Sequence, residues 1–216
     1  MDPVAIETPH GPARAHLHAA ERRLAALVLG HGAGGGVTAR DLVAARDAAL
    51  AAGVSVVLVE QPYRVAGRRS PAPARQLDAA WVAAVDVLRG RELRGLPFVV
   101  GGRSSGARVA CRTAAGLGAV GVLCLAFPLR PPRRSSAAVA ATRLPELEAV
   151  EVPTLVVQGT GDPFGMPPPG PLREVVALPG GHALTTDLPG LAAAVGEWLG
   201  RLVRPGRGVA PPPGGR

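Results

Sequence analysis

Ser104 stands in a Gly-x-Ser-x-Gly pattern, with Gly102 two residues before it and Gly106 two residues after it. The apolar residues 96–101 are predicted to form a short strand, and residues 105–117 are predicted to form a helix. A serine between a strand and a helix can occupy a strained turn that exposes its hydroxyl, and the two glycines let the flanking backbones approach closely. The pattern indicates a nucleophilic serine, but in a chain with 29 glycines it needs support from other residues.

Two downstream loops supply that support. A serine hydroxyl becomes a good nucleophile when a base takes its proton and a third group orients the base. Asp162 follows the apolar residues 154–159, and His182, the only histidine after Ser104, follows residues 174–178. The order Ser, Asp, His at the ends of strands is typical of a triad for acyl transfer. Taken alone, Asp162 could be a turn residue and His182 an exposed loop histidine.

The glycine-rich residues 31–36 follow another apolar stretch, residues 24–30. Acyl transfer needs N–H donors for the oxyanion that develops on the substrate, and we expect the backbone N–H groups of Ala33 and Ser105 to supply them. We expect His31 to brace this loop through side-chain hydrogen bonds. The loop could instead be flexible or bind phosphate, but a phosphate loop would need a lysine and a dinucleotide fingerprint would need another glycine spacing.

Three further side chains are candidate substrate contacts, namely Arg103, Arg130 and Tyr63. Arg103 lies beside the serine and could favour an anionic substrate, although a structural ion pair is the alternative. Arg130 follows the apolar residues 119–127, in a group of arginines within 130–134. That group could bind a carboxylate or phosphate, or it could simply be solvated.

The composition argues against several other classes of protein. The formal net charge is +8, and all 24 basic residues are arginines. Aromatic residues make up only 3% of the chain, which leaves few side chains to stack on bases, so we expect no nucleic-acid partner. Cys111 and Cys124 are predicted to be buried apolar residues in a reducing compartment. His16 and His18 share one face of a strand but lack a nearby third ligand. We therefore expect neither a metal nor another cofactor.

The elements that would position these residues alternate between apolar strands and helical stretches. We predict an α/β fold, a mostly parallel twisted sheet with helices on both faces and with little or no cap domain. A single domain is expected over residues 1–203, opening with a hairpin within 1–19, and residues 204–216 are expected to be a disordered Pro/Gly/Arg tail. We expect strands over 24–30, 54–60, 96–101, 119–127, 154–159 and 174–178, and helices over about 38–52, 74–90, 105–117, 143–150 and 187–202.

The N-terminal residues lack a signal-peptide pattern, and no apolar run reaches about 18 residues. We therefore expect a cytoplasmic protein with no membrane partner. Oligomeric state has no signature in the sequence.

Over roughly residues 20–202 the chain resembles the α/β-hydrolase fold family. Within it, the chain is similar to small lidless bacterial members grouped with the testis-expressed-30 and non-specific-lethal-complex hydrolase-like domains, and more distantly to dienelactone hydrolase-like enzymes. The resemblance implies that Ser104, Asp162 and His182 occupy the family's catalytic positions. Many relatives have methionine where this chain has Ser105. The segments that carry the resemblance are residues 31–35, 61–64, 67–69, 101–106, 127–129 and 158–165.

These observations predict a serine hydrolase that acts on an ester or thioester bond of a small molecule through an acyl-enzyme. The alternative is a non-catalytic interaction module with the same fold, since some members of the group resemble interaction domains.

Overall fold

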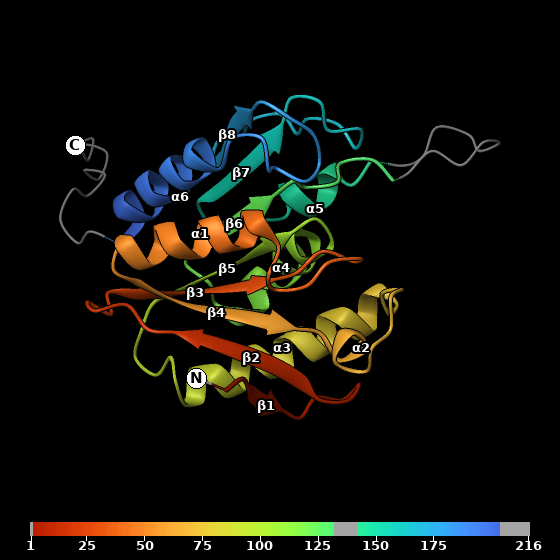
Figure 1. Cartoon of the computed structure of the whole chain (residues 1–216), viewed down its shortest axis with the longest axis vertical. Helices are drawn as coiled ribbons and strands as arrows, with labels where there is room; N and C mark the ends of the chain where they lie inside the picture. The colour runs from red at the N-terminus through yellow and green to blue at the C-terminus, as the bar shows by residue number, and fades with distance from the viewer. Residues whose placement is uncertain (1, 132–141, 204–216) are drawn as a thin grey trace, which may run out of the picture.

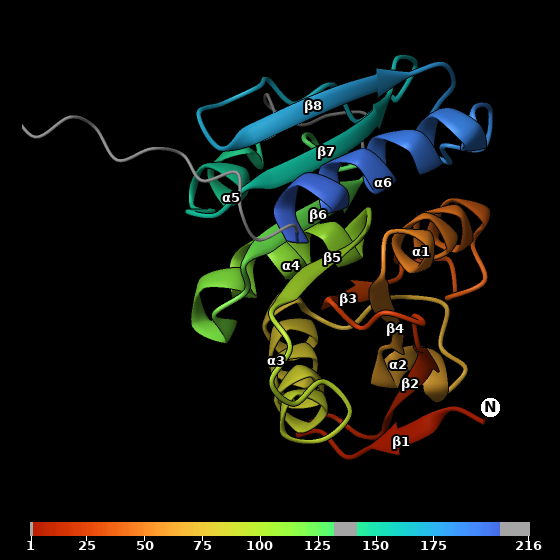
Figure 2. The ribbon, with the colours of Figure 1, turned by 90° about the vertical axis from the view of Figure 1, so that its left-hand side faces the viewer.

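An eight-stranded sheet forms the centre of the computed structural model, which describes residues 2–131 and 142–203 (Figure 1). The strand order is β1-β2-β4-β3-β5-β6-β7-β8. The pairs β1–β2 and β2–β4 are antiparallel, and every other neighbouring pair is parallel. Figure 2 shows the sheet twisting from β1 at one end to β8 at the other. The strands are β1 (Val4–Ile6), β2 (Ala13–His18), β3 (Ala25–Gly30), β4 (Val54–Glu60), β5 (Phe98–Arg103), β6 (Gly121–Leu125), β7 (Thr154–Gly159) and β8 (Arg173–Leu178).

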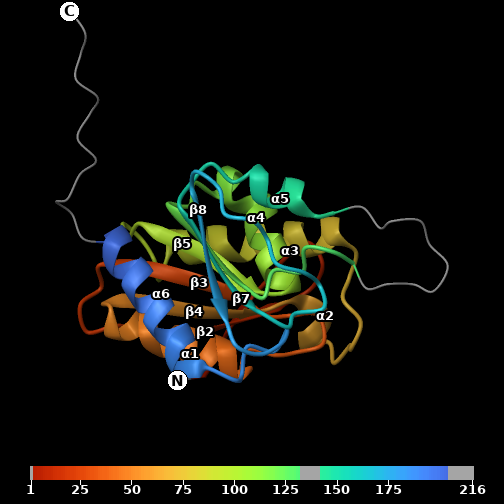
Figure 3. The ribbon, with the colours of Figure 1, turned by 90° about the horizontal axis from the view of Figure 1, so that it is seen from above.

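Helices cover both faces of this sheet (Figure 3). α1 and α6 pack side by side on one face, and α3 and α4 lie against the other. Each face has its own apolar core, one around Leu42 and Leu191 and the other around Trp81 and Val109. The helices are α1 (Arg40–Ala51), α2 (Pro62–Val65), α3 (Ala74–Gly90), α4 (Ser105–Leu117), α5 (Leu144–Glu148) and α6 (Leu188–Val203).

The continuous apolar runs of the sequence become strands that are covered on both sides. Every residue of β3, β6 and β7 is buried, as expected for central strands of a parallel sheet between two helical layers. β8 lies at the edge and is only partly buried. The predicted α/β fold is therefore confirmed, and within the described residues no cap domain stands over the sheet.

The order of the strands makes the end of β3 a topological switch point. The chain leaves β3 for β4 on one side of it and then returns to β5 on the other side. The loops after β3 and β5 therefore separate in opposite directions, and in open parallel sheets ligands bind at such a switch point. The loop at residues 31–36 follows β3, and Ser104 follows β5.

Several predicted boundaries differ from the observed ones. The strand predicted over 119–127 is shorter in the structure, where β6 ends at Leu125. It ends there because Ala126 adopts a positive φ of 50°, which breaks the extended backbone. The four-residue helix α2 was not predicted, because one turn is too short to show a helical period. The tail predicted at 204–216 lies outside the described residues. So do Arg133 and Arg134, two arginines of the group within 130–134.

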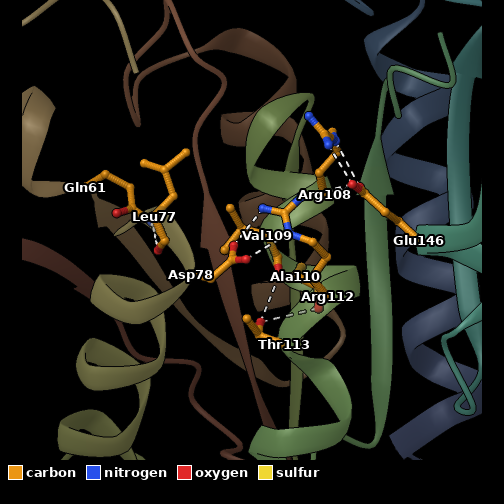
Figure 4. A network of polar contacts seen from close by, with 9 residues as sticks. All are labelled: Gln61, Leu77, Asp78, Arg108, Val109, Ala110, Arg112, Thr113 and Glu146. Carbon is orange, nitrogen blue, oxygen red and sulfur yellow. Dashed lines mark hydrogen bonds and ion pairs between the residues drawn. The ribbon is translucent and has the colours of Figure 1, made fainter. Parts of the chain in front are cut away.

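A polar network joins the three helices α3, α4 and α5 (Figure 4). Arg112 on α4 donates two hydrogen bonds to Asp78 on α3, at 2.8 and 2.6 Å. Arg108, one turn earlier on α4, donates to Glu146 on α5, which Arg112 also contacts. Planar guanidinium groups suit such paired contacts with carboxylates. The network links the middle of α4 to the helices on either side of it.

In the part of the chain that the structure describes, no helix is both long and apolar enough to cross a membrane. Cys111 and Cys124 are both buried and free, and their Sγ atoms lie 3.5 Å apart.

Candidate active site

Ser104 occupies the sharp turn between β5 and α4. Its φ of 52° and ψ of −109° lie outside the regions that residues other than glycine ordinarily adopt. Such a conformation costs about 1–3 kcal/mol and persists only where the surroundings impose it. Here the N–H of Ser104 donates to the carbonyl of Leu125 on the neighbouring strand, at 2.8 Å. The strained turn lifts the hydroxyl out of the sheet, as the strand–serine–helix order predicted.

The two glycines of the pattern permit a close approach to β3. A Cβ on Gly102 would lie 2.5 Å from the carbonyl oxygen of Gly30 and 2.7 Å from the backbone of Gly106. A Cβ on Gly106 would collide with the same carbonyl and with the backbone of His31. Backbone atoms cannot move aside as a flexible side chain can, so both positions require glycine.

The three residues predicted to form a triad lie in one chain of contacts. His182 Nε2 is 2.9 Å from Ser104 Oγ, and His182 Nδ1 is 2.8 Å from Asp162 Oδ2. An ionised carboxylate only accepts hydrogen bonds, so Nδ1 carries the proton and Nε2 presents its lone pair to the hydroxyl. The side chain of Asp162 is fully buried, and that of His182 is 21% exposed. The arrangement can remove a proton from Ser104.

Two residues that the sequence analysis did not single out hold Asp162. Phe164 donates its N–H to Asp162 Oδ1 at 2.9 Å, and Gln158 Nε2 donates to Oδ2 at 2.9 Å. The ring of Phe164 also contacts the His182 ring edge-on, with centroids 4.5 Å apart. A polar glutamine inside the buried strand β7 was the one available signal, because buried polar side chains generally serve a hydrogen bond.

The loop after β3 presents the N–H group that was predicted as one oxyanion donor. Among the described residues, the N–H groups of Ala33 and Ser105 have no acceptor. His31 Nδ1 donates to the carbonyl of Gly32 at 2.9 Å, and its Nε2 accepts the N–H of Gln61 at 3.1 Å. In a trans peptide the C=O and N–H point in opposite directions. The hydrogen bond from His31 to the carbonyl of Gly32 therefore also fixes the direction of the Ala33 N–H, which belongs to the same peptide. His31 braces the loop in the way that was expected.

Burial keeps His31 neutral. It is 3% exposed, and the removal of its ring from water lowers its pKa below the ordinary value of 6.5. A neutral ring can donate from Nδ1 and accept at Nε2, as both of its contacts require.

The three candidate substrate contacts lie in different surroundings. The hydroxyl of Tyr63 donates to the carbonyl of Ala33 at 2.9 Å, and burial raises its pKa to about 12. Arg103 forms an ion pair with Asp41 at 2.6 Å. Arg130 is exposed, and its backbone N–H donates to the backbone carbonyl of Phe164, the residue whose ring contacts His182. The structure therefore engages Tyr63 and Arg103 with the protein and leaves the side chain of Arg130 at the surface.

No clustered metal ligands accompany this site. Within residues 2–131 and 142–203 there is no group of three His, Cys, Asp or Glu side chains that could hold a metal ion. His16, one of the two strand histidines, instead contacts Glu60 on β4 at 3.1 Å.

A mostly parallel sheet with a serine at the turn after β5, and with acid and histidine on the loops after β7 and β8, defines the class of α/β hydrolases. A family model described as an alpha/beta hydrolase domain matches residues 23–169. This match spans more than half of the chain, and the chain belongs to that family.

Solved structures share this fold over nearly the whole chain. XC6422 from Xanthomonas campestris, described as an a/b serine hydrolase without lid, is 19% identical, with coverage of 93% of this chain and 94% of that chain and a TM-score of 0.74. Est1E from Butyrivibrio proteoclasticus is 14% identical, with coverage of 94% and 99% and a TM-score of 0.75. Dienelactone hydrolase from Anabaena variabilis is 17% identical, with coverage of 94% and 98% and a TM-score of 0.72.

No curated protein matches the chain in sequence. The similarity to the narrower testis-expressed-30 group stays a prediction.

Proposed function

We propose that the protein is a serine hydrolase that cleaves an ester or thioester bond of a small acyl substrate. The observation that carries this proposal is the unbroken contact chain from Ser104 Oγ through His182 to Asp162. A hydroxyl at 2.9 Å from a correctly oriented imidazole is within reach of general-base catalysis. Family membership supports hydrolase chemistry on this fold.

In the first half of the reaction, Ser104 Oγ attacks the acyl carbonyl while His182 Nε2 takes the hydroxyl proton. Asp162 holds Nδ1 and stabilises the imidazolium that forms. The negative oxygen of the tetrahedral intermediate accepts hydrogen bonds from the N–H groups of Ala33 and Ser105. His182 then returns the proton to the departing alcohol or thiol, and an acyl-serine remains.

In the second half, water takes the place of the leaving group. His182 removes a proton from the water as it attacks the acyl-serine, and the same two N–H groups stabilise the second tetrahedral intermediate. Collapse of this intermediate returns the proton to Ser104 Oγ and releases the carboxylic acid.

Hydrolysis of p-nitrophenyl esters tests the proposal. We expect the wild type to hydrolyse short acyl esters and Ser104→Ala to lose that activity, because removal of a triad serine lowers kcat by about a million-fold. A panel of acyl-chain lengths, thioesters and an ester of an aromatic acid, such as methyl ferulate, identifies the preferred acyl group. Circular dichroism establishes that Ser104→Ala keeps the fold. Equal turnover by the two proteins would refute the mechanism.

The non-catalytic module is the alternative outcome. It predicts that neither protein turns over any member of the ester and thioester panel. Hydrolysis by the wild type, with Ser104→Ala inactive, excludes the non-catalytic module.

A further inference from the structure

Arg103, the residue directly before Ser104, contacts two of the loops that the chemistry needs. Its Nε donates to Asp41 Oδ2 at 2.6 Å, and its Nη2 donates to the carbonyl of His182 at 3.3 Å. Only 17% of the Arg103 side chain is exposed. One guanidinium therefore bridges the start of α1 and the backbone of the loop that carries the proposed base.

The same guanidinium lies against the loop after β3. A Cβ placed on Gly32 would be 2.7 Å from Arg103 Nη1 and 3.6 Å from the Cβ of Ser104. Gly32 thus leaves the space that the guanidinium fills. The peptide that joins Gly32 to Ala33 carries the N–H proposed as an oxyanion donor, so Arg103 packs beside that donor.

Asp41 anchors this arrangement from the other side. Its side chain is 1% exposed, and its Oδ1 accepts the N–H of Leu42 at 2.9 Å in the first turn of α1. Burial raises the pKa of Asp41, and the charge of Arg103 opposes that shift. A buried carboxylate without its cationic partner is strongly unfavourable, so each group holds the other in place.

The loop that carries His182 needs such an anchor. Gly180 and Leu184 both adopt positive φ, at 108° and 50°. Leu184 is not a glycine, so its conformation persists only if the surrounding contacts impose it. The Arg103 contact to the carbonyl of His182 is one such contact from outside the loop.

We propose that Arg103 is a positioning residue that sets the His182 loop and the oxyanion loop relative to Ser104, with buried Asp41 as its anchor. The inference rests on the proposed function, in which Ser104 is the nucleophile. Misplacement of a catalytic group by about 1 Å can lower the rate about a hundred-fold. A lysine at this position would keep the charge but could not make both hydrogen bonds and fill the space beside Gly32, because its single ammonium lacks the planar fork of arginine.

The test uses the rate at which a fluorophosphonate probe labels Ser104, together with kcat and KM for a neutral p-nitrophenyl ester. We expect Arg103→Lys to lower the labelling rate and kcat by about 10- to 100-fold, with KM changed by less than about three-fold. Thermal unfolding checks that this variant folds. The double variant Arg103→Met with Asp41→Asn leaves no buried unpaired charge, and we expect it to lose labelling rate to the same extent.

Arg112→Lys is the matched control. Arg112 lies in the helix that follows Ser104 and pairs with Asp78, and its side chain is 21% exposed. Within the described residues, its side chain donates hydrogen bonds to Asp78 and Glu146 and to no group of the proposed site. We expect Arg112→Lys to unfold at a lower temperature than the wild type, because its paired hydrogen bonds to Asp78 are lost. We expect the probe to label Ser104 in this variant at the wild-type rate.

The outcomes separate the inference from the proposed function. A wild type that is not labelled at Ser104 overturns both. A labelled wild type with an equally fast Arg103→Lys overturns the positioning role alone. A selective rise in KM for anionic esters in Arg103→Lys, with kcat unchanged, also overturns it and makes Arg103 a substrate-binding residue.

Discussion

At the scale of single residues, the polar atoms around Ser104 are engaged so that only a few remain for chemistry. Both carboxylate oxygens of Asp162 accept hydrogen bonds from the protein, and Nδ1–H of His182 donates to one of them, Oδ2. The remaining ring nitrogen faces the serine hydroxyl. The N–H groups of Ala33 and Ser105 are without acceptors in the described residues. In the proposed mechanism, the tetrahedral oxyanion accepts hydrogen bonds from these two donors.

His31 provides a pH-dependent test at this scale. Its pKa is below 6.5 in the folded protein because burial disfavours the charged ring. The unfolded chain therefore binds a proton more readily, and the stabilisation from neutral His31 is present above pH 6.5 and is lost as the pH falls.

We expect His31→Gln to unfold about 1–2 kcal/mol more easily than the wild type at pH 8, because two buried hydrogen bonds are disturbed. We also expect kcat to fall about ten-fold or more, since the N–H of Ala33 is less well aimed. Urea denaturation from pH 8 to pH 5 measures the difference, which should shrink on acidification. A difference that grows toward pH 5 contradicts the assignment.

At the scale of elements, the junction between β5 and α4 determines the geometry of the site. Gly102 and Gly106 let this junction lie against Gly30 on β3, and Arg103 connects it to α1 and to the loop after β8. The junction therefore meets β3, α1 and the loop after β8 at one point. These contacts impose the positive φ of Ser104.

Two glycines of α4 test how much this contact matters. We expect Gly106→Ala to lower the unfolding free energy by about 3 kcal/mol or more, because its Cβ meets backbone atoms that cannot retreat. A Cβ on Gly116, near the end of the same helix, would meet no atom within 4 Å. We expect Gly116→Ala to raise stability by about 0.5–1 kcal/mol. Equal effects of the two substitutions, measured by chemical denaturation, would show that close packing is not the reason for Gly106.

The elements, and the meeting of Ser104, Asp162 and His182 in one chain of contacts, could be predicted from sequence because their signals are local. Ser104 directly follows the strand β5, and Asp162 and His182 lie a few residues after β7 and β8. Asp41 resembles an ordinary acidic residue in a first helical turn, and no local pattern connects it with Arg103, 62 positions away. Ala126 ends β6 early through its backbone conformation, which alanine itself does not signal. Local sequence patterns therefore do not predict contacts between distant segments or unusual backbone angles.

At the scale of the whole molecule, two apolar cores lie on opposite faces of one sheet, and polar pairs connect the helices above them. The largest of the networks described links α3, α4 and α5 through Glu146. Burial raises the pKa of Glu146, but hydrogen bonds and charges from Arg108 and Arg112 outweigh this and hold it below 4.5. A depressed carboxyl pKa contributes stability above the unfolded value and loses it as the pH falls through the folded value.

We expect Glu146→Gln to be about 1–2 kcal/mol less stable than the wild type at pH 7, since two arginines lose a charged acceptor. The difference should persist down to about pH 5, begin to shrink below the ordinary glutamate pKa of 4.5, and disappear as the pH falls through the lower pKa of the folded state. Glu148→Gln, in the same helix but exposed, is the control and should leave stability unchanged. A Glu146→Gln difference that is constant from pH 7 to pH 3 contradicts the role of the ion pairs.

In the proposed mechanism, His182 and Asp162 activate Ser104 as a nucleophile. The most direct measurement is mass spectrometry of the protein after treatment with a fluorophosphonate probe, with the modified residue located by peptide mapping. We predict one adduct per chain on Ser104 in the wild type, no adduct in Ser104→Ala, and much slower labelling in His182→Ala. An unlabelled wild type, or an adduct on Ser105 or elsewhere, would contradict the account.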